Sequence, residues 1–157
     1  HDHDFLGICK KLAELLDGDT NLGLKLIGPL AFEPRLFKPG LVERGPDWVE
    51  FDQLPPHICR ARACLAPLAK SAFNQCKSHI KFLESAAFGT PILATAVPDM
   101  SQHSVDGLFF PETLEDWQTS LYKLRDPEYF RHCSETLHHY ARSLLGHEHY
   151  TDALLLF

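Results

Sequence analysis

Apolar residues recur along the chain in two kinds of run, which together predict helices that alternate with short strands. Near the start they repeat at helical spacing, so we expect a first helix that is capped by Asp4 and stops at Gly18. Two more helices are expected towards the end, one over residues 114–124 behind a Thr113 cap and one over residues 127–145.

Short apolar runs between turn residues predict strands. We expect them at residues 24–27, 48–51, 64–66, 91–95 and 108–110. Because these strands alternate with helices, we predict the α/β fold class: a Rossmann-like, three-layer domain with a parallel sheet and right-handed crossovers. In such a sheet a ligand is expected at the carboxyl ends of the strands.

Proline and glycine mark the segments between these elements. They predict loops over residues 30–47 and 67–77 and a short helix over residues 55–61 that opens with two prolines. The strongest local signal is a helix that leads directly into the strand at 91–95. Ser78 is its expected N-cap and Gly89 suits the left-handed position past its end. Its apolar positions share one face: Ile80, Leu83 and Ala87.

A doubly wound half normally begins with a strand, whereas the first predicted element here is a helix. We therefore expect a further strand ahead of residue 1, with residues 1–157 forming one domain of a longer protein. An uncovered sheet edge would favour a dimer of this fragment.

Composition narrows the possible functions. The chain has 15 Lys and Arg against 21 Asp and Glu, a net charge of −6 that is unfavourable for nucleic-acid binding. No apolar run approaches the roughly 20 residues that span a bilayer, and no signal pattern opens the sequence. The five cysteines form no Cys-x-x-Cys pair and the ten histidines show no metal-ligand spacing. We expect free thiols, a cytoplasmic location and no metal site.

Basic side chains are concentrated in the middle of the chain. No acidic residue stands between Asp52 and Glu84, whereas that stretch holds Arg60, Arg62, Lys70, Lys77 and Lys81. It runs into the expected helix start at Ser78, where free N–H groups and the helix dipole favour a phosphate. Charge alone is equally compatible with a chance cluster of solvated side chains.

Three polar residues lie three positions apart on that helix: Ser78, Lys81 and Glu84. The first two suit a phosphate, and a carboxylate at Glu84 can accept hydrogen bonds from two vicinal ribose hydroxyls. The alternative is a capped helix whose surface ion pair contributes about 0.2–0.5 kcal/mol.

One stretch resembles a known enzyme family. Residues 77–95, KSHIKFLESAAFGTPILAT, resemble the donor-binding signature of GT-B glycosyltransferases of the group-1, retaining, family-4-like type. Weaker similarities extend the resemblance over nearly the whole chain, at residues 2–5, 54–55, 64–68, 106–109 and 116–117.

The resemblance implies a carboxy-terminal domain that binds a nucleoside diphosphate sugar and requires no metal or other cofactor. Glu84 is implied to hold the ribose of this sugar donor. The diphosphate is implied to lie against the helix start, at Lys77, Ser78, His79, Ile80 and Lys81. The base is implied to lie near Phe51, Asp52 and Gln53.

The resemblance further implies a hexosyltransferase that transfers sugar, with retention, to a glycan, lipid or other acceptor, as in polysaccharide biosynthesis. An amino-terminal domain of the same protein would hold the acceptor. Residues 1–157 alone are therefore expected to bind nucleotide without transferring sugar. The chain departs from the family at Cys76, where many relatives carry a second Glu eight positions before Glu84.

Other function classes compete with this interpretation. A non-catalytic Rossmann-like nucleotide-binding or interaction module would keep the fold and lose the sugar chemistry together with the glutamate that Cys76 replaces. A dinucleotide oxidoreductase would need a G-x-G-x-x-G string, which the sequence lacks. A thiol hydrolase built on Cys76 would need a partner His or Asp that the sequence does not assign.

Overall fold

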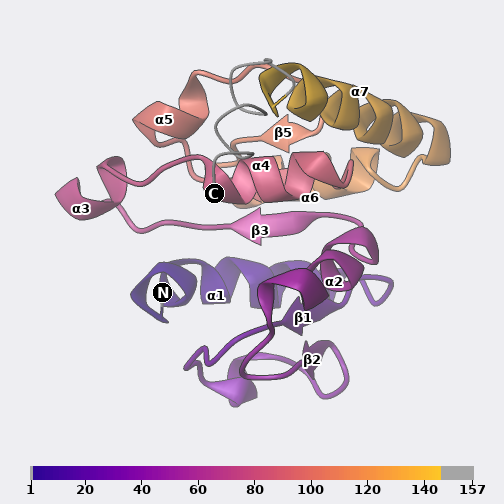
Figure 1. Cartoon of the computed structure of the whole chain (residues 1–157). Coiled ribbons are helices and arrows are strands. Elements are labelled where there is room, and N and C mark those ends of the chain that lie inside the picture. The colour runs from indigo at the N-terminus through magenta and orange to yellow at the C-terminus, as the bar shows by residue number, and fades with distance from the viewer. Residues whose placement is uncertain (1, 146–157) are drawn as a thin grey trace.

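Parallel strands carry the architecture of the chain, of which a computed structural model describes residues 2–145 (Figure 1). The strands are β1 Leu24–Leu26, β2 Val42–Arg44, β3 Cys64–Ala66, β4 Ile92–Ala94 and β5 Leu108–Phe109. They form two parallel sheets, β1-β2 and β3-β4-β5. Leu24 lies opposite Val42 in the first sheet, and Leu65 lies opposite Leu93 in the second.

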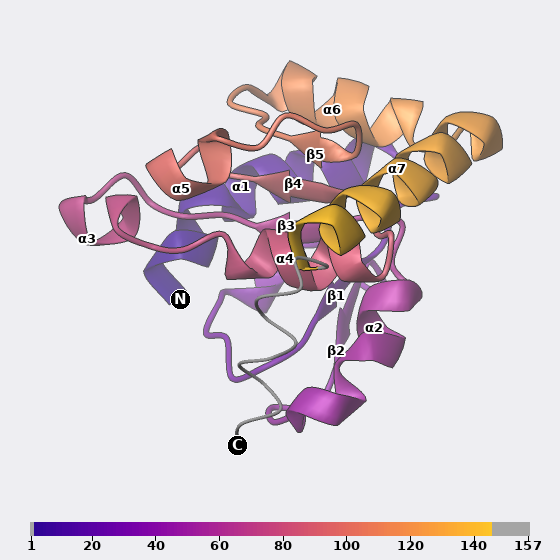
Figure 2. The ribbon, with the colours of Figure 1, turned by 45° about the horizontal axis from the view of Figure 1, so that its top comes forward.

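Helices connect and cover these strands (Figures 1 and 2). The α-helices are α1 Asp2–Gly18, α2 Pro55–Cys59, α3 Ala72–Gln75, α4 Ile80–Ala87, α5 Pro98–Ser101, α6 Leu114–Lys123 and α7 Pro127–Leu145. Two single turns of 3₁₀ helix are η1 Pro34–Leu36 and η2 Phe51–Gln53. None of the helices described is long and apolar enough to cross a bilayer.

The β3-β4-β5 sheet divides the core into two apolar clusters. On one side Leu93 of β4 packs with the buried face of α1 and with Trp117 of α6. On the other side Ile92 and Ala94 pack with α4 and α7, where Phe82 is completely buried. Because neighbouring residues of a strand point to opposite faces, β4 contributes to both clusters and the fold has three layers. The predicted Rossmann-like α/β class is confirmed.

Gly89 ends α4 as the sequence predicts, with a left-handed φ of +63°. A Cβ at this position would lie 2.6 Å from Ser134 Oγ and 2.8 Å from Ser134 O. Glycine therefore both permits the turn and lets α4 and α7 approach closely. The capping of α6 is confirmed as well, because Thr113 and Asp116 exchange hydrogen bonds in a capping box.

The strand predicted at residues 48–51 is wrong. The strand of this region is β2, inside the predicted loop 30–47, whereas Phe51 begins η2. Trp48 and Phe51 are each 78% exposed, so neither apolar side chain is buried against a sheet. Val42–Arg44 forms the strand because β1 supplies a partner for it.

Two predicted helix starts are also wrong. α1 already includes Asp2, so Asp4 lies in its first turn instead of capping it. α4 begins at Ile80 after an N-cap at His79, and Ser78 is not its cap. The buried face of α4 is consequently Phe82, Ser85 and Ala86, while Ile80 is 51% exposed. The predicted loop 67–77 contains a short helix, α3, and a second short helix that was not predicted, α5, follows β4.

Candidate functional site

The loops that follow β3 and β4 converge at the carboxyl edge of the sheet. Between them lies an open hollow of about 520 Å³, lined by Gln75, Cys76, Lys77, Ser78, Pro98, Asp99 and Gln102. This is the edge at which a parallel sheet is expected to bind its ligand. Of the predicted diphosphate residues, Lys77 and Ser78 line the hollow directly.

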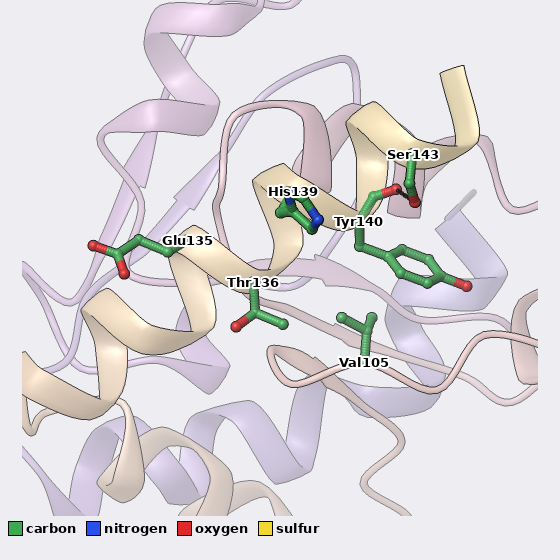
Figure 3. Close-up of a pocket in the computed structure, with 6 residues that line it drawn as sticks. All are labelled: Val105, Glu135, Thr136, His139, Tyr140 and Ser143. Atoms are coloured by element: carbon green, nitrogen blue, oxygen red, sulfur yellow. Dashed lines mark hydrogen bonds between the residues drawn. The ribbon is translucent and has the colours of Figure 1, made fainter. Parts of the chain in front are cut away.

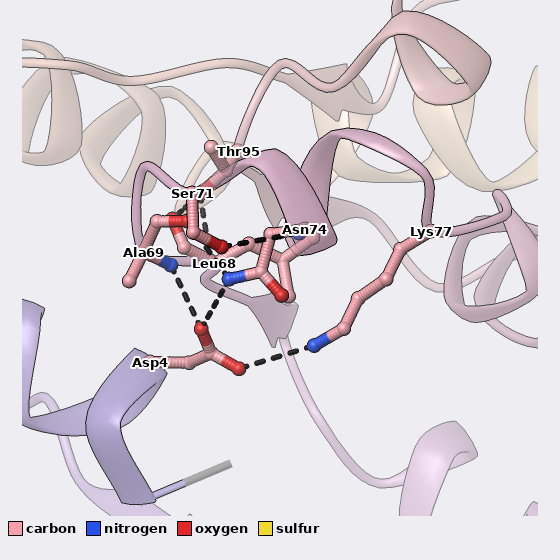
Figure 4. Close-up of polar contacts among 7 residues, drawn as sticks. All are labelled: Asp4, Leu68, Ala69, Ser71, Asn74, Lys77 and Thr95. Atoms are coloured by element: carbon pink, nitrogen blue, oxygen red, sulfur yellow. Dashed lines mark hydrogen bonds and ion pairs between the residues drawn. The ribbon is translucent and has the colours of Figure 1, made fainter.

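A buried carboxylate on α1 organises the loop after β3 (Figure 4). Asp4 Oδ1 accepts hydrogen bonds from the Ala69 N–H at 2.9 Å and from Asn74 Nδ2 at 2.7 Å. Asp4 Oδ2 lies 3.2 Å from Lys77 Nζ. The predicted phosphate ligand Lys77 is thus already held by an acidic residue that is distant in sequence.

The same loop is tied to the loop after β4. The Leu68 N–H donates to Thr95 Oγ1 at 2.8 Å, and the Thr95 hydroxyl lies 3.2 Å from the Leu68 carbonyl that it donates to (Figure 4). Ser71 caps α3 by accepting from the Asn74 N–H. Both walls of the hollow are therefore fixed by side-chain contacts and not by strand pairing alone.

Burial and hydrogen bonding shift the pKa of Asp4 in opposite directions. Burial by itself would raise the pKa of its carboxyl group. The hydrogen bonds from Ala69, Asn74 and Lys77, together with the positive charge of Lys77, outweigh that effect and lower the pKa. Asp4 is thus held as a carboxylate against the loop that it orders.

A second carboxylate lies at the start of α4. Asp99 Oδ2 accepts the backbone N–H of His79 at 2.8 Å and lies 2.8 Å from His79 Nδ1. Asp99 Oδ1 accepts from Gln102 Nε2 at 2.8 Å. The N–H of His79 is therefore occupied from within the protein. The N–H groups of Ile80 and Lys81, in the first turn of α4, have no acceptor among the described residues.

An aromatic cluster extends inward from His79. Its ring lies edge-on to that of His103, with centroids 4.6 Å apart. His103 is buried against Phe82, and its Nδ1 lies 3.0 Å from the Tyr140 hydroxyl. Its Nε2 has no hydrogen-bond partner within the described part of the chain. Burial lowers the pKa of His103, and the nearby His79 lowers it further, while Asp99 acts in the opposite direction.

Lys81 and Glu84 form an ion pair of 2.9 Å on α4, one turn further along. The Glu84 side chain is only 17% exposed, whereas that of Lys81 is 60% exposed. The Glu84 carboxylate therefore lies partly covered, near Cys64 of β3; burial raises the pKa of the Cys64 thiol, and the charge of Glu84 adds to that rise.

The structure separates some of the residues that the sequence groups together. Phe51, Asp52 and Gln53 are exposed on η2, and no hydrogen bond, ion pair or ring contact among the described residues joins them to α4. Arg62 precedes β3 and lies over the Phe130 ring at 4.4 Å, away from the carboxyl edge. The basic stretch is thus distributed over the fold instead of surrounding one ligand.

A second hollow, of about 370 Å³, lies on the outer face of α7 (Figure 3). It is lined by Val105, Glu135, Thr136, His139, Tyr140 and Ser143. None of the residues predicted for the site lines it.

Sequence reasoning missed Asp99, Asn74 and Thr95. Asp99 and Thr95 were detectable in principle, because each follows β4 closely and so belongs to the carboxyl edge. Asp4 was assigned only as a helix cap. No group of three or more His, Cys, Asp or Glu side chains in residues 2–145 could hold a metal ion.

The comparison with family models agrees with this geometry. The model described as glycosyl transferases group 1 matches residues 8–126, which is well over half of the chain and includes every predicted site residue. The chain belongs to this family. No curated protein matches it significantly. The group 1 glycosyltransferase domain therefore has the fold that the sequence predicts, and its family chemistry is glycosyl transfer.

Proposed function

We propose that this group 1 glycosyltransferase domain binds a nucleoside diphosphate sugar at the carboxyl edge of β3 and β4. The observation that carries the proposal is the hollow at the start of α4, formed by the loop before that helix and by α5. A helix start offers N–H groups and a positive dipole to a diphosphate. Here those groups belong to Ile80 and Lys81.

The chemistry that these groups support is departure of the nucleoside diphosphate. In the reaction the bond from the anomeric carbon to a phosphate oxygen breaks, and its electron pair goes to the diphosphate. An acceptor hydroxyl bonds to the same carbon and loses its proton. N–H groups and cationic side chains stabilise the charge that develops on the leaving oxygen. Lys81 is suited to this because its side chain is 60% exposed and lies in the first turn of α4.

Glu84 is proposed to accept hydrogen bonds from the two ribose hydroxyls. Its carboxylate is partly covered, and a donor-free domain keeps it paired with Lys81. Binding of the nucleotide would exchange that ion pair for hydrogen bonds to the ribose and release Lys81 towards the diphosphate. Phe51, which is 78% exposed on η2, is proposed to contact the base together with Asp52 and Gln53.

We also propose the details of the reaction and its setting. The donor carries a hexose, the configuration at the anomeric carbon is retained, and no metal cofactor is needed. The domain acts in the cytoplasm, in polysaccharide biosynthesis. We further propose that an amino-terminal domain supplies the acceptor site. Residues 1–157 would then bind nucleotide without transferring sugar, since catalysis requires both substrates to be held together.

A second candidate function is a nucleotide-binding or interaction module without catalysis. Cys76 favours it, because this exposed thiol lines the hollow where many relatives of the resembled family place a glutamate. Its Sγ lies 3.5 Å from the Ala72 carbonyl oxygen and carries no charge partner in the described chain. Such a module would bind nucleotide but would lose contacts to the sugar.

Calorimetric titration with UDP, GDP and ADP tests the proposal. Saturable binding of one of them in preference to the others is the expected result, and no binding of any would exclude the function. Titration with matching nucleotide sugars then separates the two candidates. A sugar donor should bind at least as tightly as its nucleoside diphosphate, whereas a non-catalytic module should bind it more weakly.

A further inference from the structure

One carboxylate at the carboxyl edge has no lysine or arginine partner. Asp99 lines the hollow at the start of α4, and its side chain is 38% exposed. Its Oδ2 accepts the His79 N–H and lies 2.8 Å from the ring Nδ1 of the same residue. Within residues 2–145 no Lys or Arg forms an ion pair with Asp99. The charge of Asp99 is therefore not compensated whenever the His79 ring is neutral.

Lys77 is the one cationic side chain among the described residues that line this hollow, and an anion already holds it (Figure 4). Its Nζ lies 3.2 Å from Asp4 Oδ2 and 5.6 Å from the centre of the Phe73 ring. Asp4 keeps its position because it also accepts hydrogen bonds from Ala69 and Asn74. A second anion in the hollow would have to share Lys77 with this buried carboxylate.

Asp99 and Gln102 offer hydrogen-bond acceptors to a ligand in the hollow. Gln102 Nε2 donates to the carbonyl oxygen and to Oδ1 of Asp99, each at 2.8 Å. Gln102 Oε1 accepts no hydrogen bond from the described residues, and Asp99 Oδ1 accepts only the one from Gln102. Carboxylate and amide oxygens can each accept two hydrogen bonds. The two side chains can therefore bind hydroxyl groups, whereas the other lining donors, Ser78 and Gln75, are uncharged.

The proposed placement of the nucleotide leaves this hollow for the sugar. Glu84 lies about one helix turn beyond the start of α4, where the N–H groups of Ile80 and Lys81 are located. A donor with its ribose at Glu84 and its diphosphate at those N–H groups extends past the helix start. The next group along the donor is the sugar, which then lies between the loop before α4 and α5.

We propose that this hollow binds an uncharged hexose and excludes the corresponding uronic acid, with Asp99 as the residue that discriminates between them. The inference rests on the proposed function, because it assumes that a nucleoside diphosphate sugar is the ligand. The hydroxyl groups of a hexose can donate to Asp99 and Gln102. The carboxylate of a uronic acid would instead meet a like charge, and the nearby Lys77 is already paired.

The size of the effect follows from the repulsion between the two carboxylates. Like charges about 6 Å apart at the surface of a protein repel each other enough to lower affinity by about tenfold. Because the hollow is open to solvent, added salt should reduce this difference. A hexose and its uronic acid differ in one oxidised carbon, so they form a matched pair of ligands.

The test is calorimetric titration of the full chain at about pH 8, which keeps histidine rings neutral. The ligands are a nucleoside diphosphate, its hexose form and its hexuronic acid form. The wild type should prefer the hexose form by about tenfold. In Asp99→Asn this preference should fall to about threefold or less, since the amide still accepts from hydroxyls while the charge is gone. Glu135→Gln removes one charge from the hollow on α7 and should keep the full preference.

Gln102→Leu tests the hydroxyl contact without a change of charge. It should weaken binding of the hexose form by about threefold and leave the affinity for the nucleoside diphosphate unchanged. Failure of the wild type to bind the nucleoside diphosphate itself would overturn the proposed function. Binding of that nucleotide with equal affinities for the two sugar forms would overturn this inference alone. So would a preference in Asp99→Asn equal to that of the wild type, or unchanged hexose binding in Gln102→Leu.

Discussion

The carboxylate of Asp99 lies across the start of α4, where it accepts the backbone N–H of His79 at 2.8 Å. An anion from within the protein thus occupies one of the positions at which a diphosphate would be favoured. Any phosphate in the hollow must share this helix start with Asp99, which also lines the hollow.

Replacing Asp99 with Asn should therefore strengthen nucleoside diphosphate binding by about two- to fivefold, since the amide oxygen can still accept from His79 while the repelling charge is gone. The gain should shrink as salt is added. Asp116→Asn is the matched control, because that carboxylate caps α6 and does not line the hollow. Calorimetric titration at two ionic strengths measures both variants, and unchanged affinity in Asp99→Asn would show that phosphate does not bind here.

Glu84→Gln should weaken nucleoside diphosphate binding by about 1.5–3 kcal/mol, the scale for hydrogen bonds to a charged group. Stability should fall by less than about 1 kcal/mol, because Lys81 in the lost ion pair is mostly exposed. Lys81→Met breaks the same pair and is the control. With a nucleoside that carries no phosphate, only Glu84→Gln should lose affinity. If Glu84→Gln and Lys81→Met lost equal stability and neither changed nucleotide affinity, the ion pair would have only a structural role.

Asp4→Ala should lower the free energy of unfolding by about 2–4 kcal/mol, because Ala69, Asn74 and Lys77 lose a buried partner. The folded pKa of Asp4 lies below its ordinary value of 3.8, so its contribution is present above that pH and is lost as pH falls through the lowered value. Urea unfolding at about pH 7 and about pH 3 should show the wild type and the variant converging in acid. A constant difference would contradict the carboxylate's role.

His103 should make the domain sensitive to mild acid. Its folded pKa lies below the ordinary value of 6.5, so the unfolded chain binds a proton first as pH falls, and stability declines from that pH downwards. His103→Phe removes this titration, while Tyr140→Phe removes only the hydroxyl that faces it. Unfolding curves across the range should be flatter for His103→Phe than for Tyr140→Phe. Parallel pH profiles of the two variants would refute the assignment.

Two glycine substitutions should have opposite effects on stability. Gly89→Ala places a Cβ 2.6 Å from Ser134 Oγ at a φ of +63°, and should cost at least about 2 kcal/mol. Gly18→Ala, at the end of α1 with no atom within 4 Å of the new Cβ, should gain about 0.5–1 kcal/mol. Denaturant unfolding of both variants measures these changes in stability. An unchanged free energy of unfolding in Gly89→Ala would mean that α4 and α7 are packed less closely.

Features that depend on neighbouring residues could be predicted from the sequence alone. The capping box of Thr113 and Asp116 and the left-handed turn at Gly89 are contacts within a few positions of the chain. The order of helices and strands followed from such signals, apart from β2 and the short helices α3 and α5. The hollow is likewise at the strand edge that a parallel α/β fold predicts.

Strand pairing and helix orientation were decided by tertiary structure. Val42–Arg44 becomes a strand because β1 lies beside it, whereas the more apolar Trp48 and Phe51 have no such partner and stay exposed. α4 starts at Ile80, and the residue that precedes it, His79 and not Ser78, is the N-cap and donates its N–H to Asp99 of α5. The helix then turns Phe82 inward.

The candidate site shows the same division. Residue types and spacing were enough to point to Ser78, Lys81 and Glu84 and to an anion at a helix start. The partners of these groups come from other parts of the chain: Asp4 is 73 positions from Lys77, and Asp99 is 20 positions from His79. Periodicity reports only which face of an element is apolar. Which charges meet in a hollow depends on how separate elements pack, so only the folded chain could show that Lys77 is already paired and that Asp99 stands where a phosphate would bind.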